Sequence, residues 1–213
     1  MDFTKIDPKI LARQLSKPEG KMGEDVGKML AEKQGGHSAF VFEFLQLQPA
    51  DHVLEIGFGP GEDIAETVRL TPKGYVAGID YSDVMLKMAQ ERNHRAIMQE
   101  HVELILGDAK DLPYADGSFD KIFCLNVFHF WREPLRELAE CLRVLKSGGR
   151  LVVYLPHPSH LMPGMSDTGL FIAREPEEVA SLFTQVGFRN VDHHLRNMGD
   201  VNNGKSFIVC GTK

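Results

Sequence analysis

Three glycines at alternate positions follow a short apolar run in the segment VLEIGFGPGED, residues 53–63. They are Gly57, Gly59 and Gly61, and the acid Glu55 stands two positions before the first of them. Glycine permits positive φ and lets a ligand approach the backbone closely, while a helix N-terminus behind such a loop favours negative charge. The pattern predicts a nucleotide-binding loop, and the question is which nucleotide it holds.

The spacing disfavours two familiar nucleotide loops. A dinucleotide fingerprint requires G-x-G-x-x-G, but the sixth position counted from Gly57 is Glu62. No tyrosine is followed four residues later by the lysine of a short-chain dehydrogenase, and no G-K-[ST] phosphate loop occurs. A nicotinamide-dependent oxidoreductase therefore remains only as a minor alternative.

Two further acids follow apolar runs that are typical of buried strands. Asp80 comes after the run 75–79, 19 residues beyond Gly61, and Asp108 comes shortly after the run 102–106. In an open α/β sheet, ligands bind outside the carboxyl ends of the strands, and the glycine loop, which follows the first predicted strand, is expected there. A carboxylate there can accept hydrogen bonds from ribose hydroxyls, whereas the alternative for each acid is a helix cap.

Short apolar runs alternate with helix-length amphipathic stretches through most of the chain. The pattern predicts strands at 52–56, 75–79, 102–106, 121–126 and 150–154, and helices at 61–70, 82–93, 133–145 and 177–186. Two last strands, 191–196 and 206–210, flank the turn-rich NMGDVNNGK and should pair as an antiparallel hairpin. This order indicates an α/β, Rossmann-like, doubly wound, mostly parallel seven-stranded sheet with helices on both faces.

The segment before the first strand is expected to form an N-terminal helical cap, residues 1–48, on a single unit of residues 49–213. Roughly the first 20 residues carry turn-formers, and a helical pattern starts near Glu24 and divides at Gly35-Gly36. Further along, Ser82 is predicted to cap a helix, and Gly148 with its neighbours to end the helix 133–145.

Composition narrows the classes of partner. The 213 residues suit one domain with a substantial core, and 24 basic against 30 acidic residues give a net charge of −6, so no nucleic-acid partner is expected. Cys124, Cys141 and Cys210 lack any metal spacing, so we expect reduced thiols in a cytoplasmic protein and no metal. No run approaches ~18 apolar residues, so no membrane span is expected.

The E-x-G-x-G-x-G loop resembles the first motif of class I S-adenosylmethionine-dependent methyltransferases, in particular those that act on small molecules. Similar segments follow in the family's order: GYVAGIDYS, LILGDAKDLPYADGSFDKIFCLNVFHFW, LRVLKSGGRLVVY and LFTQVGF. The resemblance covers roughly residues 51–213. It implies S-adenosyl-L-methionine as cofactor, S-adenosyl-L-homocysteine as product, and methyl transfer to O, N or C of a small organic acceptor.

The resemblance also implies roles for residues around the methionine and ribose parts of the cofactor. Gly57, Gly59 and Gly61 would wrap the methionine portion, and Glu55 would orient its amino group. Asp80 would hold the ribose.

For the adenine, the resemblance implies contacts on two sides. Tyr81 and Met85 would lie against the ring face, with plain core packing as their alternative. Asp108 would accept a hydrogen bond from the adenine amino group, and the backbone of Ala109 would lie nearby.

Asn126 and Val127, at the end of the fourth strand, are implied to close the pocket. Just beyond them, His129 is the candidate catalytic residue, because an imidazole titrates in the range that suits a general base. Its alternative is a histidine packed among aromatic neighbours, and a base is needed only if the nucleophile arrives protonated. His157 and His160 are interpreted as loop histidines, since no third metal ligand has a recognisable spacing.

The acceptor is not specified by any motif. The N-terminal helices and residues 155–171 are rich in Met, Phe, Pro and Gly, which is compatible with a mobile lid over an apolar pocket. Other classes stay open: a protein that binds S-adenosylmethionine or S-adenosylhomocysteine without turnover, and a methyltransferase acting on RNA or protein. The sequence does not predict the oligomeric state.

Overall fold

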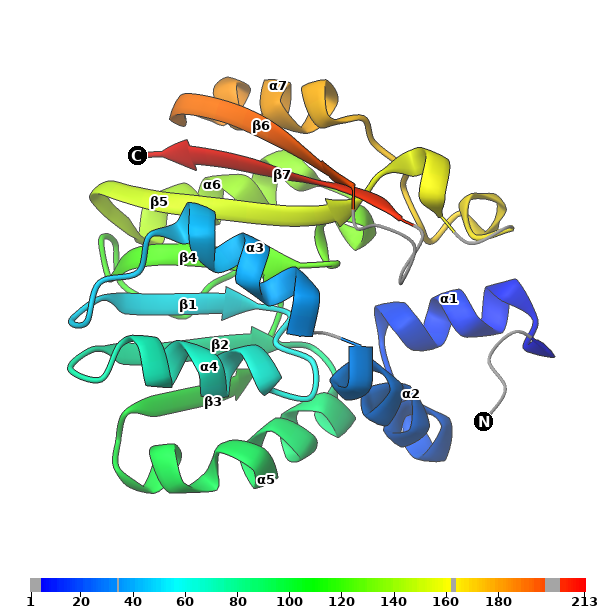
Figure 1. Ribbon diagram of the computed structural model, residues 1–213, viewed down its shortest axis with the longest axis horizontal. Coiled ribbons are helices and arrows are strands. Elements are labelled where there is room, and N and C mark those ends of the chain that lie inside the picture. Colours follow the sequence, from blue (N-terminus) through cyan, green and yellow to red (C-terminus); the bar gives the residue numbers. More distant parts are fainter. Residues whose placement is uncertain (1–4, 34, 162–163, 198–203) are drawn as a thin grey trace.

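The computed structural model describes residues 5–33, 35–161, 164–197 and 204–213. Its centre is a seven-stranded sheet in the order β3-β2-β1-β4-β5-β7-β6 (Figure 1). The strands are β1 (His52–Ile56), β2 (Tyr75–Asp80), β3 (Val102–Leu106), β4 (Phe119–Leu125), β5 (Leu145–Pro156), β6 (Arg189–Asn197) and β7 (Lys205–Thr212). Neighbours from β3 to β5 pair in parallel, and β7 runs antiparallel to both β5 and β6. The predicted doubly wound sheet with a terminal hairpin is confirmed, although the hairpin turn 198–203 lies outside the described residues.

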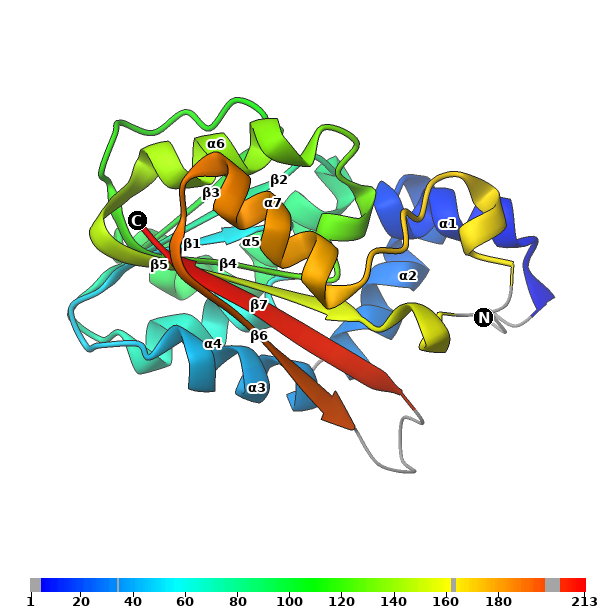
Figure 2. The same cartoon turned by 90° about the horizontal axis from the view of Figure 1, so that it is seen from above.

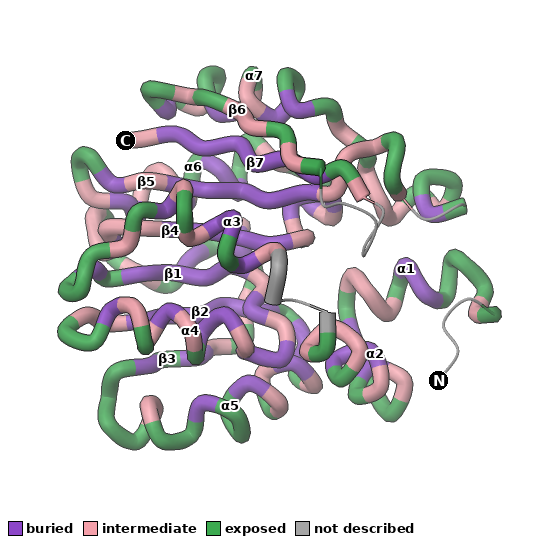
Figure 3. The backbone as a smooth tube through the Cα atoms, in the orientation of Figure 1, coloured by how far each residue is buried: buried purple, intermediate pink, exposed green. Residues whose placement is uncertain are grey.

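Helices cover both faces of this sheet (Figure 2). One face carries α3 (Gly35–Leu45), α4 (Glu62–Leu70) and α5 (Asp83–Met98), and the other carries α6 (Pro134–Val144) and α7 (Pro176–Val186). Side chains alternate across each strand, so Val53 packs toward α3 while its neighbour Leu54 belongs to the core on the α6 and α7 side. The central strands are therefore buried on both faces (Figure 3).

Strand order places a ligand-binding crevice at one edge of the sheet. From β1, the chain crosses through α4 to β2 on one side, whereas β4 lies on the other side of β1. The loops that leave the carboxyl ends of β1 and β4 therefore diverge, as they do at the switch point of an open α/β sheet.

Two N-terminal helices lie beyond these carboxyl ends (Figure 1): α1 (Pro8–Ser16) and α2 (Gly20–Lys33). The prediction of turn structure over the first residues was wrong for 8–16. Asp7 caps α1 by accepting from the amide of Lys9 at 2.8 Å, and Leu11 is buried against Met165. The division at residue 48 stays a prediction, and α3, which precedes it, packs on β4 and β5.

Most other predicted elements are confirmed within a few residues. Ser82 caps α5 as expected, with its hydroxyl accepting from the amide of Met85 at 3.2 Å. The glycine stop after α6 was wrong: the helix ends at Val144, and Gly148 lies within β5. Strand pairing takes over there, since Leu145 already pairs with Phe119 of β4.

Candidate cofactor and acceptor site

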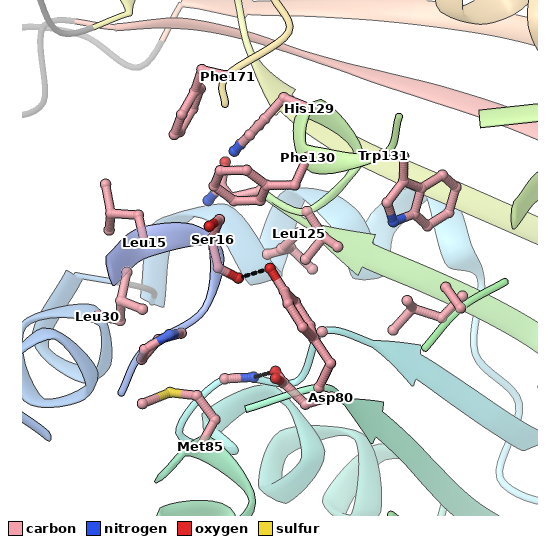
Figure 4. Close-up of a pocket in the computed structure, with 18 of the residues that line it drawn as sticks. Leu15, Ser16, Leu30, Asp80, Met85, Leu125, His129, Phe130, Trp131 and Phe171 are labelled. Atoms are coloured by element: carbon pink, nitrogen blue, oxygen red, sulfur yellow. Dashed lines mark hydrogen bonds between the residues drawn. The ribbon is translucent and has the colours of Figure 1, made fainter. Parts of the chain in front are cut away.

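A cavity of about 450 Å³ opens at the carboxyl ends of β1, β2 and β4. This volume falls within the range of small-molecule sites, and side chains from α1 and α2 complete its wall. In Figure 4, Asp80 and Met85 lie at one end of the cavity, and His129, Phe130 and Phe171 lie at the other. The two ends differ in chemistry, because a carboxylate marks the first and aromatic rings dominate the second.

The glycine loop adopts a backbone conformation that is unfavourable for residues other than glycine. Gly57 has φ +71°, and a Cβ there would lie 2.4 Å from the Cγ2 atom of Val127. Gly59 has φ +52° and borders open space, with no atom within 4 Å of a Cβ position. Gly61 has φ +83° and packs instead against Ala89 of α5. Gly57 therefore lets the loop pass close to Val127, Gly59 leaves room for a ligand, and Gly61 lets the loop meet a helix.

Asp80 joins the loop to the end of β2. Its carboxylate accepts from the amide of Gly59 at 3.0 Å and from the amide of Ser82 at 2.9 Å, and the residue is 8% exposed. Burial raises the pKa of Asp80 to about 6, although the backbone hydrogen bonds oppose that shift. A carboxylate that lines the cavity with lone pairs to spare fits the hydroxyls of a ribose.

Two buried acids lie beneath the loop. Glu55 is 1% exposed, and its Oε2 atom has no hydrogen-bond partner among the described residues. Burial raises the pKa of Glu55 well above its usual value, with further contributions from Asp63 and Asp80. Asp63 accepts a hydrogen bond from Ser38, and burial raises the pKa of Asp63 to about 6. When ionised, these carboxyls favour a cationic ligand group nearby, although Glu55 itself does not line the cavity.

The N-terminal helices are held to the cavity rim by two hydrogen bonds. The Tyr81 hydroxyl donates to the carbonyl of Ser16, and the Ser82 hydroxyl donates to the carbonyl of Pro18 at 2.6 Å. The sequence did not predict these two hydrogen bonds, because every residue has a backbone carbonyl and no residue type identifies the one that accepts. The link encloses Met85, which is 1% exposed and lines the cavity.

Two loops close the remaining sides of this end. Asp108 is exposed and accepts from the amide of Lys110 at 3.0 Å, and Ala109 is buried beside it. Asn126 has φ +56°, and its amide donates to the carbonyl of Tyr154 at 3.0 Å, so the chain turns sharply where β4 ends. Val127 follows this turn against Gly57.

His129 is part of an aromatic wall. It is 5% exposed, its ring stacks on Phe171 at 4.0 Å between centroids, and Phe130 meets both rings edge-on. Burial, and then the charge of Arg174, lower the pKa of His129 to about 3. The imidazole is therefore neutral at physiological pH, and its Nδ1 atom has no hydrogen-bond partner among the described residues.

The cavity brings together most of the residues singled out from the sequence. Glu55 and Gly61 do not line it; those that do are Gly57, Gly59, Asp80, Tyr81, Met85, Asp108, Ala109, Asn126, Val127 and His129. His160 also lines it, whereas His157 does not. Over the described ranges, no three His, Cys, Asp or Glu side chains are grouped so that they could hold a metal ion.

One buried acid of the cavity wall gave no signal in the sequence. Glu137 is 2% exposed, lines the cavity, and has an Oε2 atom without a hydrogen-bond partner in the described part of the chain. It lies in the first turn of α6, where an acid ordinarily faces solvent near the helix N-terminus. Only the packing of α6 against the cavity revealed it.

Comparison with known proteins points to one family. Residues 54–153 match the family model described as a methyltransferase domain. The chain is 24% identical to the uncharacterized methyltransferase YdaC of Bacillus subtilis, over 81% of this chain and 90% of that protein. It is 32% identical to the demethylmenaquinone methyltransferase of Symbiobacterium thermophilum, over 54% of this chain and 46% of that one.

A solved structure shares the whole fold. The S-adenosylmethionine-dependent methyltransferase from Aquifex aeolicus superposes with a TM-score of 0.69 at 23% identity, covering 97% of this chain and 98% of that one. In contrast, the chain spans less than half the length of several curated relatives that it matches. Within the described ranges, none of the helices combines the length and the apolar character needed to cross a bilayer.

Proposed function

We propose that this chain, which belongs to the class I S-adenosylmethionine-dependent methyltransferases, transfers a methyl group to a small organic acceptor by in-line displacement. The observation that carries the proposal is the junction of the glycine loop with Asp80. There, side-chain-free backbone and a carboxylate face the same cavity. A cytoplasmic location is part of the same proposal and remains a prediction.

The residues at the Asp80 end fit the cofactor. Gly57 and Gly59 would pass along the methionine portion, and Glu55 would orient its amino group from below the loop. The positive charge of that amino group would favour the ionised form of the Glu55 carboxyl, whose pKa burial raises in the ligand-free protein. Asp80 would accept from the ribose hydroxyls. Gly61 would act indirectly, since it packs the loop on α5.

The adenine would occupy the part of the cavity between α5 and the loop after β3. Met85 and Tyr81 would contact the ring face, and Asp108 with the Ala109 backbone would meet its edge. Asn126 and Val127 would close the cavity on the β4 side.

The aromatic end would receive the acceptor. When bound, the cofactor supplies a methyl group already activated on a sulfonium, so the protein has mainly to align the acceptor and exclude water. Alignment of this kind can be worth ~7–11 kcal/mol of the barrier. Phe130 and Phe171 provide an apolar wall for this purpose, and Leu15 of α1 and Leu30 of α2 line the same cavity.

His129 would touch the acceptor. With its pKa near 3, the neutral imidazole suits hydrogen bonding to the acceptor better than storage of a proton at neutral pH. Its fixed position against Phe171 would orient the nucleophilic atom toward the methyl group.

Calorimetric titration with S-adenosylmethionine, S-adenosylhomocysteine and NAD tests the proposal. We expect micromolar binding of the first two ligands and none of NAD. Binding of NAD alone would overturn the cofactor assignment. Binding without release of S-adenosylhomocysteine across a wide acceptor panel would favour a binding protein, and label transfer into RNA or protein from a lysate would favour a macromolecular substrate.

A further inference from the structure

Four polar side chains at the mouth of the cavity form a chain of one ion pair and two hydrogen bonds. Glu175 Oε2 lies 3.4 Å from His157 Nε2, His157 Nδ1 lies 2.9 Å from Ser159 Oγ, and Ser159 Oγ lies 2.8 Å from His160 Nδ1. His160 at the end of this chain lines the cavity. Ser159 and His160 are themselves exposed, and the chain leads from the cavity to a carboxylate that is half exposed to solvent.

The backbone around these side chains fixes their order. Residues Pro158–His160 form a 3₁₀ turn, in which side chains three apart eclipse one another, so His157 and His160 lie on the same side. The amide of His157 donates to the carbonyl of Lys205 at 2.9 Å, and its ring lies against Phe207. The arrangement is therefore anchored to β7.

The contacts among these four side chains indicate which atoms donate and which accept. The amide of Ser159 donates to His157 Nδ1 at 3.3 Å, and an amide can only donate, so this nitrogen carries no proton. In a neutral imidazole the proton then sits on Nε2, which faces Glu175. The Ser159 hydroxyl lies 2.9 Å from the same nitrogen and can share its lone pair, and a hydroxyl that donates there accepts from His160 Nδ1. In this arrangement His160 Nε2 keeps its lone pair.

We propose that His160 is a catalytic base for a phenol-type acceptor, that is, a hydroxyl on an apolar aromatic frame. The inference rests on the proposed methyl transfer and names its substrate class. The wall of Phe130, Phe171 and His129 supplies apolar contact for such a ring. A hydroxyl needs a base, because a phenol with a pKa like the ~10 of tyrosine arrives protonated.

The step balances without any further reactant. The hydroxyl proton moves to His160 Nε2, the acceptor oxygen forms its bond to the methyl carbon, and the carbon–sulfur bond breaks with its electron pair remaining on sulfur. The Nδ1 proton of His160 can pass to Ser159, the Ser159 proton to His157 Nδ1, and the Nε2 proton of His157 to Glu175. The proton thereby reaches solvent through Glu175.

The first test measures the tautomers by ¹⁵N nuclear magnetic resonance of the histidine side chains at alkaline pH. Signals are assigned with His160→Gln and His157→Gln, and exposed His94 on α5 serves as an internal reference. We expect His160 to be protonated on Nδ1 and His157 on Nε2, and Ser159→Ala to abolish the Nδ1 preference of His160. Protonation of His160 on Nε2 in the wild-type protein would overturn the proposal.

The second test uses phenol and 4-nitrophenol as probe acceptors, because the latter is already ionised in mildly alkaline solution. His160→Gln should lower kcat for phenol by about 100-fold or more, with a much smaller effect for 4-nitrophenol. His94→Gln is the matched control and should change neither. An equal loss for both probes would refute a role as base.

The two proposals fail in distinguishable ways. Absence of S-adenosylmethionine binding in the wild-type protein defeats the proposed function, whatever the histidine tautomers are. Normal cofactor binding with the wrong His160 tautomer defeats only the acceptor assignment. The tautomer measurement needs no acceptor, so it tests the assignment of His160 as the base even if neither probe is methylated.

Discussion

The amide of Gly59 donates a hydrogen bond to the carboxylate of Asp80 at 3.0 Å, so the glycine loop after β1 is tied to the end of β2. The same carboxylate accepts from the amide of Ser82, the residue that caps α5. Asp80 therefore serves the fold of the site as well as the proposed binding of ribose. This double role governs how its substitutions should behave.

Replacement of Asp80 by alanine should reduce the affinity for S-adenosylmethionine by about 10- to 100-fold, because it removes charge-assisted hydrogen bonds worth ~1.5–3 kcal/mol. Asp80→Asn keeps one acceptor oxygen for the loop and should retain more stability. Calorimetry gives the affinity, and urea unfolding gives the stability. The control is Asp83→Asn, on an exposed position three residues away. Wild-type affinity in Asp80→Ala would remove the ribose assignment.

Cofactor affinity should weaken as pH falls through about 6, where ligand-free Asp80 becomes protonated and offers fewer acceptor sites. Binding near this pH should release protons, which calorimetry detects as a dependence of the heat on the buffer. In Asp80→Asn this part of the pH dependence should vanish. A pH-independent affinity in the wild-type protein would contradict the assignment.

The stability of the ligand-free protein should show the opposite trend. The folded pKa of about 6 for Asp80 lies above the unfolded value of 3.8, so its stabilising contribution is complete below pH ~4 and is lost as pH rises through ~6. The size is on the order of 3 kcal/mol. Asp63, with the same direction of shift, adds to it. Urea unfolding across this range measures the trend, and added cofactor should diminish it.

Gly57 and Gly59 allow a matched pair of substitutions, because both have positive φ. An alanine at Gly57 would also overlap Val127, whereas one at Gly59 would enter open space. We expect Gly57→Ala to cost about 1–3 kcal/mol more in free energy of unfolding than Gly59→Ala. Equal destabilisation would show that Val127 can move aside. Cofactor affinity should fall in both variants.

Tyr81→Phe should speed the dissociation of S-adenosylmethionine, since the lost hydroxyl holds α1 at the carbonyl of Ser16. Stopped-flow displacement by S-adenosylhomocysteine measures the rate, and we expect an increase of about 2- to 10-fold for one hydrogen bond. Tyr75→Phe is the control, because that hydroxyl bonds Glu103 away from the cavity. Unchanged dissociation would mean that α1 does not restrain the ligand.

His129→Phe should preserve the aromatic wall while removing both ring nitrogens. We expect the affinity for S-adenosylmethionine to stay within about twofold and turnover to fall by at least tenfold, as for a lost hydrogen bond to the reacting group. Full turnover would reduce His129 to a packing residue. The measurement pairs calorimetry with release of S-adenosylhomocysteine.

The alternation of apolar runs and amphipathic stretches was sufficient to predict the sheet, its parallel core and the terminal hairpin. These features follow from local periodicity and chain order, which the sequence carries directly. The resemblance to methyltransferases implied that Asp80 and Asp108 belong to one site, and both line the cavity at the carboxyl ends of the strands. Local signals failed at α1, whose Asp7 cap was overlooked, and at Gly148, where strand pairing prevailed over a glycine stop.

Only the tertiary structure determined the protonation state of the site residues and which groups surround them. Burial and Arg174 lower the pKa of His129, and neither can be read from the letters NVFHFW. Glu137 turned inward, although its position suggested a solvated acid. The ion pair between Glu175 and His157 joins two residues that lie far apart in the sequence, so no local pattern indicates it. Desolvation and hydrogen bonding depend on which atoms surround a group in space, and only folding brings those atoms together.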